Sequence, residues 1–409
     1  MNRNRLTSRM AAGLDGFKQT ALLAAAGALV LAGCGAPGGG EAEGGGEVSI
    51  LFVAGKSGPT ATIVGDVTQG LEAAIAKVND AGGVNGETVT LEVLDTGGDP
   101  TRAVSELQRR LSQGDKPDLV IPGVSSVESL ALTPLLTREK IVSINNAASP
   151  ELNKPDEYPY HFGYTPVPLD QQAGLADGLA GLEAESVVAL LGNDPYGKSM
   201  GEAITERLEG TGVDLRIEEF KLDEIDLSIA YERAISSNPD AVFFEAIGDP
   251  VKRLVEARSV VGATDIPTIG GFGINSTDGG PSEWATDEQN ENLYTEVFAS
   301  QVYVAPEERS EALTGFFEQM EKLDGVRESV QSPFIFYDIV NLYAAAASEA
   351  GSTDAGKVKE QLEGDLDVDL VFWQQHSWSP DDHFPSPESQ EFSLVPKGEL
   401  VDGMFKPVG

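Results

Sequence analysis

The chain has 409 residues, of which 41% are hydrophobic, so it can bury a full core and global disorder is excluded. Its formal net charge of −38 at pH 7 repels DNA, RNA and anionic lipid, which excludes a nucleic-acid-binding protein. The length leaves room for two domains of ordinary size after an N-terminal targeting segment is removed.

The N-terminus has the layout of a secretory signal. A basic start is followed by the apolar run 21–32, which is too short to span a bilayer comfortably. The run ends in Leu31-Ala32-Gly33-Cys34, which resembles the lipobox of bacterial lipoproteins. This resemblance implies cleavage before Cys34 and attachment of lipid to its sulfur, so residues 1–33 are predicted to be a signal peptide. The alternatives are an ordinary signal peptide with an incidental cysteine, or an uncleaved anchor.

The mature chain is therefore predicted to lie outside the cytoplasmic membrane, where lipid anchors it. Residues 34–46, rich in Gly and Glu, predict a flexible tether. Cys34 is the only cysteine, which leaves none for a disulfide within the chain. Removing residues 1–33, which carry a net charge of +3, brings the mature chain near −41. We favour adaptation to a saline habitat over the ordinary acidity of secreted proteins. The acidic residues are spread along the body, which argues against an acidic interaction tail.

Strand and helix patterns alternate from Val48 onward. An apolar run at 48–54 predicts a strand, and the Gly- and Thr-rich range 55–65 predicts a loop. Apolar residues at helical spacing predict a helix from about Asp66 to the stop at Gly82-Gly83. The pattern then repeats, with strands at 89–93, 119–121 and 141–144 and helices after Asp99-Pro100 and after the loop 123–126.

The alternation restarts after Pro166-Val167-Pro168. Helices are predicted at 169–182, 197–208, 227–235 and 250–261, and strands at 187–191, 215–220, 241–244 and 266–269. The C-terminal part predicts helices at 307–323 and 332–350 and strand-like pieces at 368–373, 392–395 and 401–405. Repeated βα units imply parallel sheets with helices on both faces, so the predicted fold class is α/β with two doubly wound parallel-sheet lobes.

An ordered set of short motifs resembles the branched-chain amino-acid-binding protein family. Each motif is weak alone, but together they cover nearly the whole mature body. They are Gly58-Pro59, Gly70-Leu71-Glu72-Ala73-Ala74, VNDAGGVNG at 78–86, Asp99-Pro100-Thr101-Arg102-Ala103, PGVSS at 122–126, AASPEL at 147–152, Asp194-Pro195-Tyr196-Gly197, NPDAV at 238–242 and Phe336-Tyr337-Asp338.

The resemblance implies the type I periplasmic binding fold, in which three crossover segments join two α/β lobes around a ligand cleft. Lobe 1 is then expected at 47–165 plus about 299–380, and lobe 2 at 166–298 plus about 381–409. The resemblance also implies a non-enzymatic carrier that delivers a small molecule to the membrane permease of an ABC importer of the hydrophobic amino acid and amide class. We expect a monomer that needs no metal, cofactor or nucleic acid.

Candidate ligand contacts in the first lobe lie in loops at the carboxyl ends of parallel strands, where open sheets bind ligands. The loop 123–126 opens a helix, so the hydroxyls of Ser125 and Ser126 and the free backbone amides suit a ligand carboxylate. Capping of that helix is the alternative role. The resemblance also implies ligand contact at Asn146, Ala147 and Ala148 in the loop after the next strand.

In the second lobe, Tyr196 matches an aromatic residue that closes over the ligand, although it can equally pack beneath the Gly197 turn. The family's acidic residue for the ligand ammonium is replaced here by Phe272, its Thr hydroxyl by Ala148, and a Tyr by Ile63 or Val64. These losses favour a less polar ligand, such as a short or aromatic carboxylate or an amide. Glu245 lies at a strand end. It either supplies the missing carboxylate for the ligand ammonium from a different direction, or it is a solvated loop acid.

The sequence gives little support for a metal site or a dinucleotide-binding site. The three histidines lack metal-ligand spacing, and Asp381-Asp382-His383 lies in a Pro-rich turn expected to be solvated. Gly270-Gly271-Phe272-Gly273 is not a dinucleotide fingerprint. Trp373 and Trp378 are expected in the core rather than in the cleft wall. The predicted function is a lipid-anchored importer component that captures a small amino-acid-like, amide or carboxylate ligand. The alternative is a sensing module that passes ligand occupancy to a membrane receptor.

Overall fold

Two mainly parallel sheets organise the part of the chain described here. The computed structural model describes residues 46–58, 60–277, 281–327, 329–373, 377–384, 392–396 and 399–406. The predicted signal peptide, Cys34 and the tether up to residue 45 lie outside these residues. The described residues belong to one compact unit.

The first lobe is built on a five-stranded parallel sheet with the strand order β2-β1-β3-β4-β5. Each strand except the last is followed by a helix or helical turn, as the alternating sequence pattern predicts. The elements are β1 (Glu47–Ala54), α1 (Ala61–Asp80), β2 (Thr88–Asp95), α2 (Pro100–Leu111), β3 (Leu119–Pro122), α3 (Ser126–Glu139), β4 (Val142–Asn145), the 3-10 turn η1 (Pro150–Leu152) and β5 (His161–Gly163).

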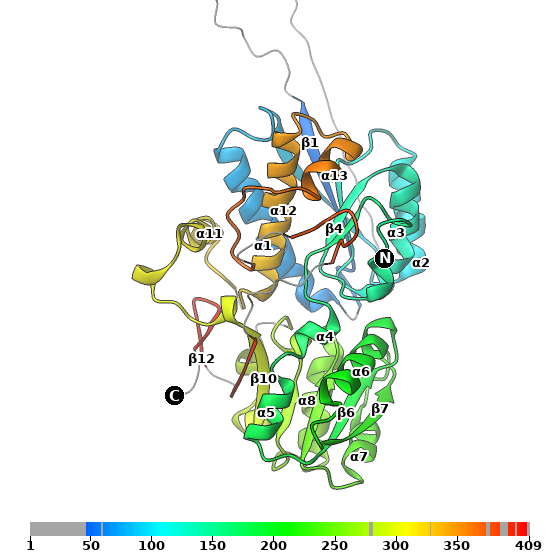
Figure 1. Cartoon of the computed structure of the whole chain (residues 1–409), viewed down its shortest axis with the longest axis vertical. Coiled ribbons are helices and arrows are strands. Elements are labelled where there is room, and N and C mark those ends of the chain that lie inside the picture. The colour runs from blue at the N-terminus through cyan, green and yellow to red at the C-terminus, as the bar shows by residue number, and fades with distance from the viewer. Residues whose placement is uncertain are drawn as a thin grey trace, which may run out of the picture. The chain divides into compact units, whose positions relative to one another are not determined.

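Helices cover both faces of this sheet, so its central strand is buried on both sides. Ile50 and Phe52 of β1 pack in the core that α1 shares with α12 (Gln331–Glu349). Leu51 and Val53, which point to the opposite face, pack against α2 and α3. Figure 1 shows α1 and α12 alongside one another, and these two helices are in close contact.

The second lobe is built on a six-stranded sheet with the order β11-β10-β9-β8-β6-β7. Five of its strands are parallel, and only the edge strand β11 runs antiparallel to its neighbour. The elements are α4 (Pro168–Gln171), α5 (Leu175–Gly181), β6 (Ser186–Gly192), α6 (Pro195–Leu208), β7 (Asp214–Phe220), α7 (Ser228–Ile235), β8 (Ala241–Glu245), α8 (Asp249–Val260), β9 (Thr268–Gly270), η2 (Phe272–Ile274), α9 (Pro281–Trp284), α10 (Asp287–Asn290), β10 (Leu293–Phe298) and β11 (Phe392–Pro396).

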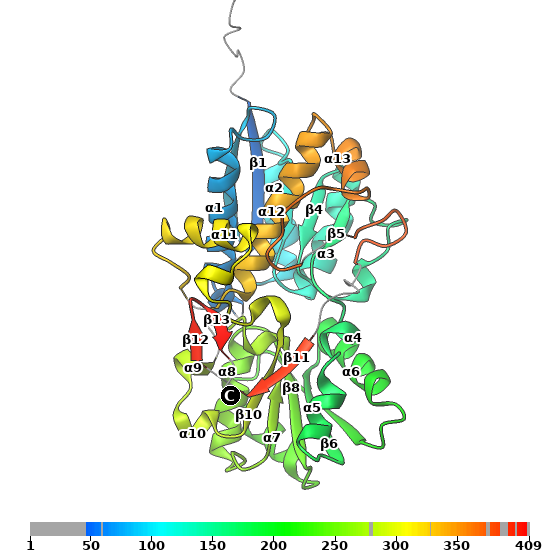
Figure 2. The same ribbon diagram turned by 60° about the vertical axis from the view of Figure 1, so that its left-hand side comes forward.

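This sheet also has a helical layer on each face. Val188 and Leu190 of β6 pack against α7 and α8, whereas Ala189 and Leu191 pack against α5 and α6. The alternation along β6 therefore divides the second lobe into two cores. Figure 2 shows β11 and β10 beside one another in this lobe. Two α/β lobes confirm the predicted fold class.

The C-terminal part of the chain contributes to both lobes. Helices α11 (Glu311–Glu321) and α12 pack against α1 of the first lobe, and α13 (Ala355–Leu362) packs against α12. Residues 377–384 contact β5, whereas β11 joins the second sheet. The hairpin of β12 (Glu399–Val401) and β13 (Met404–Lys406) is held where Tyr303 donates its backbone N–H to the carbonyl of Phe405 at 2.8 Å. Two lobe crossings, at 164–167 and after β10, lie within the described residues, and the third includes residues 385–391 outside them.

Two helices differ from the sequence prediction. The first begins at Ala61 rather than at Asp66, because Ile63 and Val64 turn into the core and extend the apolar face of α1 by one turn. The helix predicted at 169–182 is split into α4 and α5 around Gly174. Glycine lowers helix propensity, so a break at this position has a local cause.

The strand predicted at 368–373 is wrong. This segment has no strand pairing, because the buried carboxylate of Asp338 accepts the backbone N–H groups of Val371 and Phe372 at 2.9 and 2.8 Å. The hydroxyl of Tyr164 donates to the same carboxylate at 2.7 Å. A side chain of α12 thus replaces the neighbouring strand as the hydrogen-bond partner of this segment.

The expectation that the turn around His383 is solvated is also wrong. The His383 side chain is fully buried and stacks on the ring of Phe162, with ring centroids 4.0 Å apart. Its Nε2 lies 2.9 Å from the Glu363 carboxylate. The aromatic and acidic partners of this histidine come from distant parts of the sequence, so no local pattern reveals its burial.

Candidate functional site

The first wall of the site is the amino end of α3. Ser125 is extended and caps the helix, since its Oγ accepts the backbone N–H of Glu128 at 3.4 Å. Gly123 adopts φ +81°, and a Cβ there would lie 2.7 Å from the Cβ of Glu128. Ser126 is buried at 2% exposure and lines two cavities between the lobes, whereas Ser125 lines only one. The predicted helix cap is therefore Ser125, and Ser126 faces the site.

The loop after β4 is the second part of the first-lobe wall. Asn145 anchors the loop, because its side-chain amide donates to the Pro122 carbonyl at 3.3 Å and to Ser129 Oγ at 2.5 Å. Asn146, Ala147 and Ala148 follow and line one cavity. Oδ1 of Asn146 is buried and makes no hydrogen bond with the described residues. It can therefore accept a hydrogen bond from a ligand.

Tyr196 and Phe272 form the wall of the second lobe. Asp194 caps α6 by accepting the Gly197 backbone N–H at 3.0 Å, and this cap places Tyr196 at the first turn. The Tyr196 hydroxyl donates to Gln171 Oε1 at 2.7 Å. Phe272 begins η2 and packs edge-on against Phe298, with ring centroids 5.3 Å apart. Both aromatic residues line cavities that residues of the first lobe also line.

Two cavities lie between these walls. One has a volume of about 10 Å³, which is room for about one water molecule, and contacts Ile63, Asn146, Phe272 and Ser332. The other has a volume of about 150 Å³ and contacts Ser125, Asp194 and Leu222. Ser126, Tyr196 and Ile247 line both cavities. Ile63 occupies the wall where relatives were expected to carry a tyrosine, so this part of the wall is apolar.

Glu245 lies behind the cavity wall rather than in it. Its side chain is 1% exposed, so the alternative of a solvated loop acid is wrong. Oε1 accepts the Gly273 backbone N–H at 3.0 Å, while Oε2 has no hydrogen-bond partner among the described residues. Burial raises the pKa of Glu245 to about 8. The next residue, Ala246, lines the larger cavity, which places this acid one residue away from it.

Sequence reasoning missed several residues of the site. Gln171, Ile247, Ser276 and Ser332 line the smaller cavity, and Glu296 is a second buried acid near Glu245. Gly271 and Gly273 could have indicated the burial of Glu245 from the sequence, because both make room for its carboxylate. The two tryptophans Trp373 and Trp378 are buried in the aromatic core around Tyr164, as expected.

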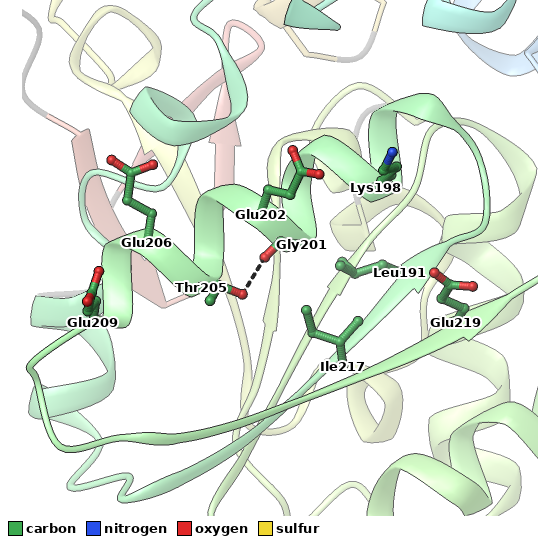
Figure 3. Close-up of a pocket in the computed structure, with 10 residues that line it drawn as sticks. Leu191, Lys198, Gly201, Glu202, Thr205, Glu206, Glu209, Ile217 and Glu219 are labelled. Atoms are coloured by element: carbon green, nitrogen blue, oxygen red, sulfur yellow. Dashed lines mark hydrogen bonds between the residues drawn. The ribbon is translucent and has the colours of Figure 1, made fainter.

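A larger hollow lies on the second lobe alone (Figure 3). Its volume is about 620 Å³, and Leu191 and Ile217 form its apolar floor between α6 and β7. Glutamates surround this floor, at positions 202, 206, 209 and 219. Since only one lobe lines this hollow, a molecule bound in it would not couple to lobe closure.

The comparisons with known proteins agree with this architecture. Residues 47–394 match the family model described as periplasmic binding protein. The chain belongs to the periplasmic binding protein family. Its members bind substrates and are not enzymes, which confirms the prediction of a non-enzymatic protein. Membership also places the chain outside the cytoplasm.

Curated relatives of this family are distant but informative. A Leu/Ile/Val-binding protein of Rhizobium johnstonii is 25% identical over 277 residues, which is 65% of this chain and 71% of the relative. An amino acid binding protein of Pseudomonas aeruginosa is 24% identical over 221 residues, which is 53% of this chain and 58% of that relative. The chain thus matches less than two thirds of the second relative's length.

Several solved structures share the fold of this chain. Leucine-binding protein LivK from Thermotoga maritima has a TM-score of 0.69 at 19% identity, covering 82% of this chain and 92% of its own. LivJ from Streptococcus pneumoniae, solved with isoleucine, has a TM-score of 0.69 at 21% identity, covering 85% and 100%. A solute-binding protein from Rhodopseudomonas palustris, solved with 3,4-dihydroxybenzoic acid, has a TM-score of 0.70 at 18% identity, covering 88% and 96%.

Two other features are absent from the described residues. No helix among them is long and apolar enough to cross a bilayer. No group of three or more His, Cys, Asp or Glu side chains in the described ranges has the geometry to hold a metal ion. The interlobe cavities, which residues of both lobes line, are the candidate functional site.

Proposed function

We propose that this chain is a lipid-anchored substrate-binding protein of an ABC importer, which captures a small amino-acid-like, amide or carboxylate ligand between its lobes. The observation that carries this proposal is that Ser126 of the first lobe and Tyr196 of the second line the same two cavities. A molecule held there contacts both lobes, so its binding favours their closed arrangement by hinge motion. An importer permease can then distinguish the loaded from the unloaded carrier.

The chemistry of the walls supports a ligand with one polar end and one apolar end. The amino end of α3 offers backbone N–H groups and a positive helix dipole to a carboxylate or amide oxygen. Val124, Ile247 and Phe272 offer apolar surface to the rest of the molecule. Isoleucine and 3,4-dihydroxybenzoic acid, with which two of the similar structures were solved, fit this description.

The lobe boundaries and the assembly state belong to the same proposal. The predicted boundaries are 47–165 plus about 299–380 for the first lobe and 166–298 plus about 381–409 for the second. Because His383 stacks on Phe162 of β5, we propose that the first lobe extends to residue 384. We propose a monomer as the working unit. A monomer offers one copy of each lobe to the permease. Size-exclusion chromatography with light scattering tests the assembly state, and a mass of twice the chain mass would contradict it.

Membrane attachment through Cys34 has its own test. The full-length chain expressed in a bacterium should be recovered in the membrane fraction, with a mass increase that corresponds to an N-terminal lipid on residue 34. The variant Cys34→Ser should remain soluble or keep its signal peptide. An unmodified wild-type cysteine in the mature protein would refute the lipid anchor and leave the binding function open.

Ligand capture is tested by thermal shift on the full-length chain. The panel contains branched and aromatic amino acids, short amides, and aliphatic and aromatic carboxylates. A ligand at about 100 times its Kd adds about 2.7 kcal/mol to the free energy of unfolding, which raises the Tm by a few degrees. Failure of every class to raise the Tm would overturn the proposed ligand class. Co-purification of the loaded chain with a sensor kinase instead of a permease would favour the receptor role.

A further inference from the structure

A cavity of about 470 Å³ lies beside the crossing that links β10 of the second lobe to α11 of the first. We call it the crossover cavity. Its lining comes from three segments: the crossing at 299–304, the first turn of α11 at 310–313, and the segment 368–372. None of the residues that line it also lines an interlobe cavity. Its volume lies within the range of about 300–1,000 Å³ that is typical of small-molecule sites.

Local hydrogen bonds hold each wall of the crossover cavity in place. The 3-10 turn η3 (Ala299–Gln301) shapes the wall that belongs to the crossing. Ser310 caps α11, since its Oγ accepts the backbone N–H of Leu313 at 3.2 Å. The buried carboxylate of Asp338 fixes the third wall by accepting the backbone N–H of Phe372 at 2.8 Å. The cavity is therefore formed in advance, which lowers the cost of ordering it around a bound molecule.

The interior of the crossover cavity is apolar. Leu313 and Phe372 are buried residues of the first-lobe core, and both line the cavity. Val304, Val368 and Leu370 also line it and pack against this core, but they are only half-buried. A molecule in the cavity would cover part of their exposed apolar surface. Burial of apolar surface favours binding, so the body of a suitable ligand is hydrophobic.

The charges on the lining are of one sign. Glu311 and Asp369 line the crossover cavity, and both are exposed, so their carboxylates lie where the cavity opens to solvent. Among the described residues, no Lys, Arg or His side chain lines the cavity. Two carboxylates at the mouth attract a cation and repel an anion.

The basic residues near this mouth are directed elsewhere. Nε of Arg309 donates to the Val304 carbonyl at 3.2 Å, and its guanidinium lies over the ring of Phe317, 4.0 Å from the centroid. Lys77 lies within electrostatic range of Asp369, but its Nζ is positioned over the ring of Tyr337. Neither Glu311 nor Asp369 forms an ion pair within the described ranges of the chain. Their charge therefore remains available to a ligand.

A series of aromatic contacts connects the crossover cavity to the interlobe site. Phe372 of the cavity wall packs edge-on against Phe298, with ring centroids 5.1 Å apart. Phe298 ends β10 of the second lobe and packs edge-on against Phe272 at 5.3 Å. Phe272 lines the smaller interlobe cavity. The contact between Phe298 and Phe372 joins the two lobes, so a hinge motion at the crossing would change it together with the cavity.

We propose that the crossover cavity is a second binding site, which takes a small hydrophobic amine and thereby favours the arrangement in which the lobes are together. The apolar body of the amine lies against Leu313 and Phe372, and its ammonium lies at the mouth near Glu311 and Asp369. Binding at this site does not depend on the proposed capture function. Where a ligand is captured between the lobes, the amine should tighten its binding, and by linkage the captured ligand should tighten amine binding by the same factor.

The first test is isothermal titration calorimetry of the full-length chain with three amines and the alcohols of the same skeleton. The probes are 2-phenylethylamine with 2-phenylethanol, cyclohexylmethylamine with cyclohexylmethanol, and tryptamine with tryptophol. We expect the amine of a recognised pair to bind about three- to tenfold more tightly than its alcohol, because two exposed carboxylates each add a modest attraction. This ratio should fall towards one in 1 M NaCl, which screens exposed charges.

Two variants that fill the crossover cavity locate the binding. Ala312→Phe adds a ring at the α11 wall and Ala299→Leu adds an aliphatic side chain at the crossing, so each should weaken amine binding by about tenfold or more. The control is Ala180→Phe, at an exposed position of α5 that does not line the cavity. It should bind the amines as the wild type does. Circular dichroism melts verify that the three variants are folded.

Two charge variants assign the amine preference to the mouth. Glu311→Gln and Asp369→Asn should each lower the ratio of amine to alcohol affinity by about two- to threefold. Glu318→Gln and Asp367→Asn are the matched controls, because these exposed acids lie in the same helix and the same segment but do not line the cavity. Both controls should keep the wild-type ratio.

Small-angle X-ray scattering tests the effect on the lobes without a captured ligand. Saturation with the best amine should reduce the radius of gyration, and an unchanged radius would overturn the effect on lobe arrangement. Amine binding that survives both Ala312→Phe and Ala299→Leu would overturn the site, and equal affinities of amines and alcohols would overturn the ligand class. Absence of binding by all three amines would overturn the inference and leave the capture function standing. Amine binding at this cavity, together with a failure of every cleft ligand, would support the site and refute only the capture function.

Discussion

The side-chain amide of Gln331 donates a hydrogen bond to the backbone carbonyl of Phe272 at 3.0 Å. Gln331 begins α12 on the first lobe, and Phe272 begins η2 on the second lobe and lines the smaller cavity. Gln301 holds the glutamine in place by donating to its Oε1 at 2.9 Å. This bond joins the two lobes directly beside the candidate site, so it contributes only while the lobes are together.

Replacing Gln331 should therefore weaken ligand binding by making the closed arrangement less favourable. A buried hydrogen bond contributes about 0.5–1.5 kcal/mol, so Gln331→Ala is expected to raise the Kd by about two- to tenfold. Calorimetry measures the Kd, and small-angle X-ray scattering should show a larger radius of gyration. Asn341→Ala is the control, because Asn341 lies in the same helix and, among the described residues, its side-chain amide donates to the Tyr337 carbonyl of that helix. Equal effects of the two variants would contradict the closure role.

Much of the fold could be predicted because each βα unit carries its own periodicity. The elements that were missed depend on distant residues. The 368–373 segment has strand-like residues, yet the Asp338 carboxylate takes the hydrogen bonds that a neighbouring strand would have made. The burial of His383 likewise requires Phe162 and Glu363, which only the folded chain brings together.

The candidate site was predictable only in part for the same reason. Ser126 and Asn146 follow strand ends, so the topology of parallel sheets places them at one edge. Glu296, in contrast, lies within the strand sequence LYTEVF, where an acid ordinarily marks a solvent-facing position. The turn at Gly174, between α4 and α5, lies against the Glu296 carboxyl, and its position is a property of the tertiary fold. Gly271 is the sequence signal for the buried Glu245, because a Cβ at this position would overlap the Glu245 carboxylate.

An alanine at residue 271 should destabilise the chain through steric overlap with Glu245. Gly271 has φ −75°, which any residue can adopt, so the cost comes from the Cβ contact rather than from the backbone. Overpacking of this kind costs about 1–3 kcal/mol in the free energy of unfolding. Urea denaturation measures this cost, and in a Glu245→Ala background the same change should cost less.

The control for this prediction is Gly181→Ala. Gly181 ends α5, and a Cβ there meets no atom within 4 Å. Alanine at such a helical position is neutral or stabilises by up to about 1 kcal/mol. If Gly271→Ala costs the same with and without Glu245, the carboxylate is not the group that requires the glycine.

Substitution of the two serines at the amino end of α3 should have different effects. One variant should lower the stability of the chain, and the other should weaken ligand binding. Ser125→Ala removes the helix cap and should lower the free energy of unfolding by about 0.5–2 kcal/mol. Ser126→Ala removes no cap but takes a hydroxyl from the wall of both cavities, so it should raise the Kd with a stability change within about 0.5 kcal/mol. Chemical denaturation and calorimetry of the two variants measure both quantities. A Kd unchanged by Ser126→Ala would exclude its hydroxyl from ligand recognition.

The stability of the chain should fall as the pH rises from 6.5 to about 8. The pKa values of Glu245 and Glu296 are each raised from 4.5 to about 8 in the folded chain, chiefly by burial. The folded chain therefore binds more protons than the unfolded chain over this range, and unfolding becomes easier as these protons are lost. Below pH 6.5 the sign is mixed, because the pKa of buried His161 is lowered to about 3 and its contribution to stability grows with pH.

Glu296→Gln should flatten this pH dependence. Each acid contributes up to about 1.4 kcal/mol per pH unit to the slope of the unfolding free energy, and glutamine contributes none. The measurement is urea denaturation at four pH values between 6.5 and 8, without ligand. Glu202→Gln makes the same Glu-to-Gln replacement at an exposed position of α6 and serves as the control. A slope in Glu296→Gln as steep as in the wild type would show that this acid does not titrate in the window.

Added NaCl should stabilise this chain, because its net charge of −38 makes the folded state repel itself at low ionic strength. The Debye length falls from about 10 Å at 0.1 M to about 3 Å at 1 M salt, which screens that repulsion. The glutamates at 202, 206 and 209 lie on one side of α6 in Figure 3 and repel one another at helical spacing. Glu206→Gln is therefore expected to raise the Tm at low salt and to lose this advantage in molar NaCl. A wild-type Tm that is flat or falls between 0.05 and 1 M NaCl, as measured by differential scanning calorimetry, would refute salt adaptation.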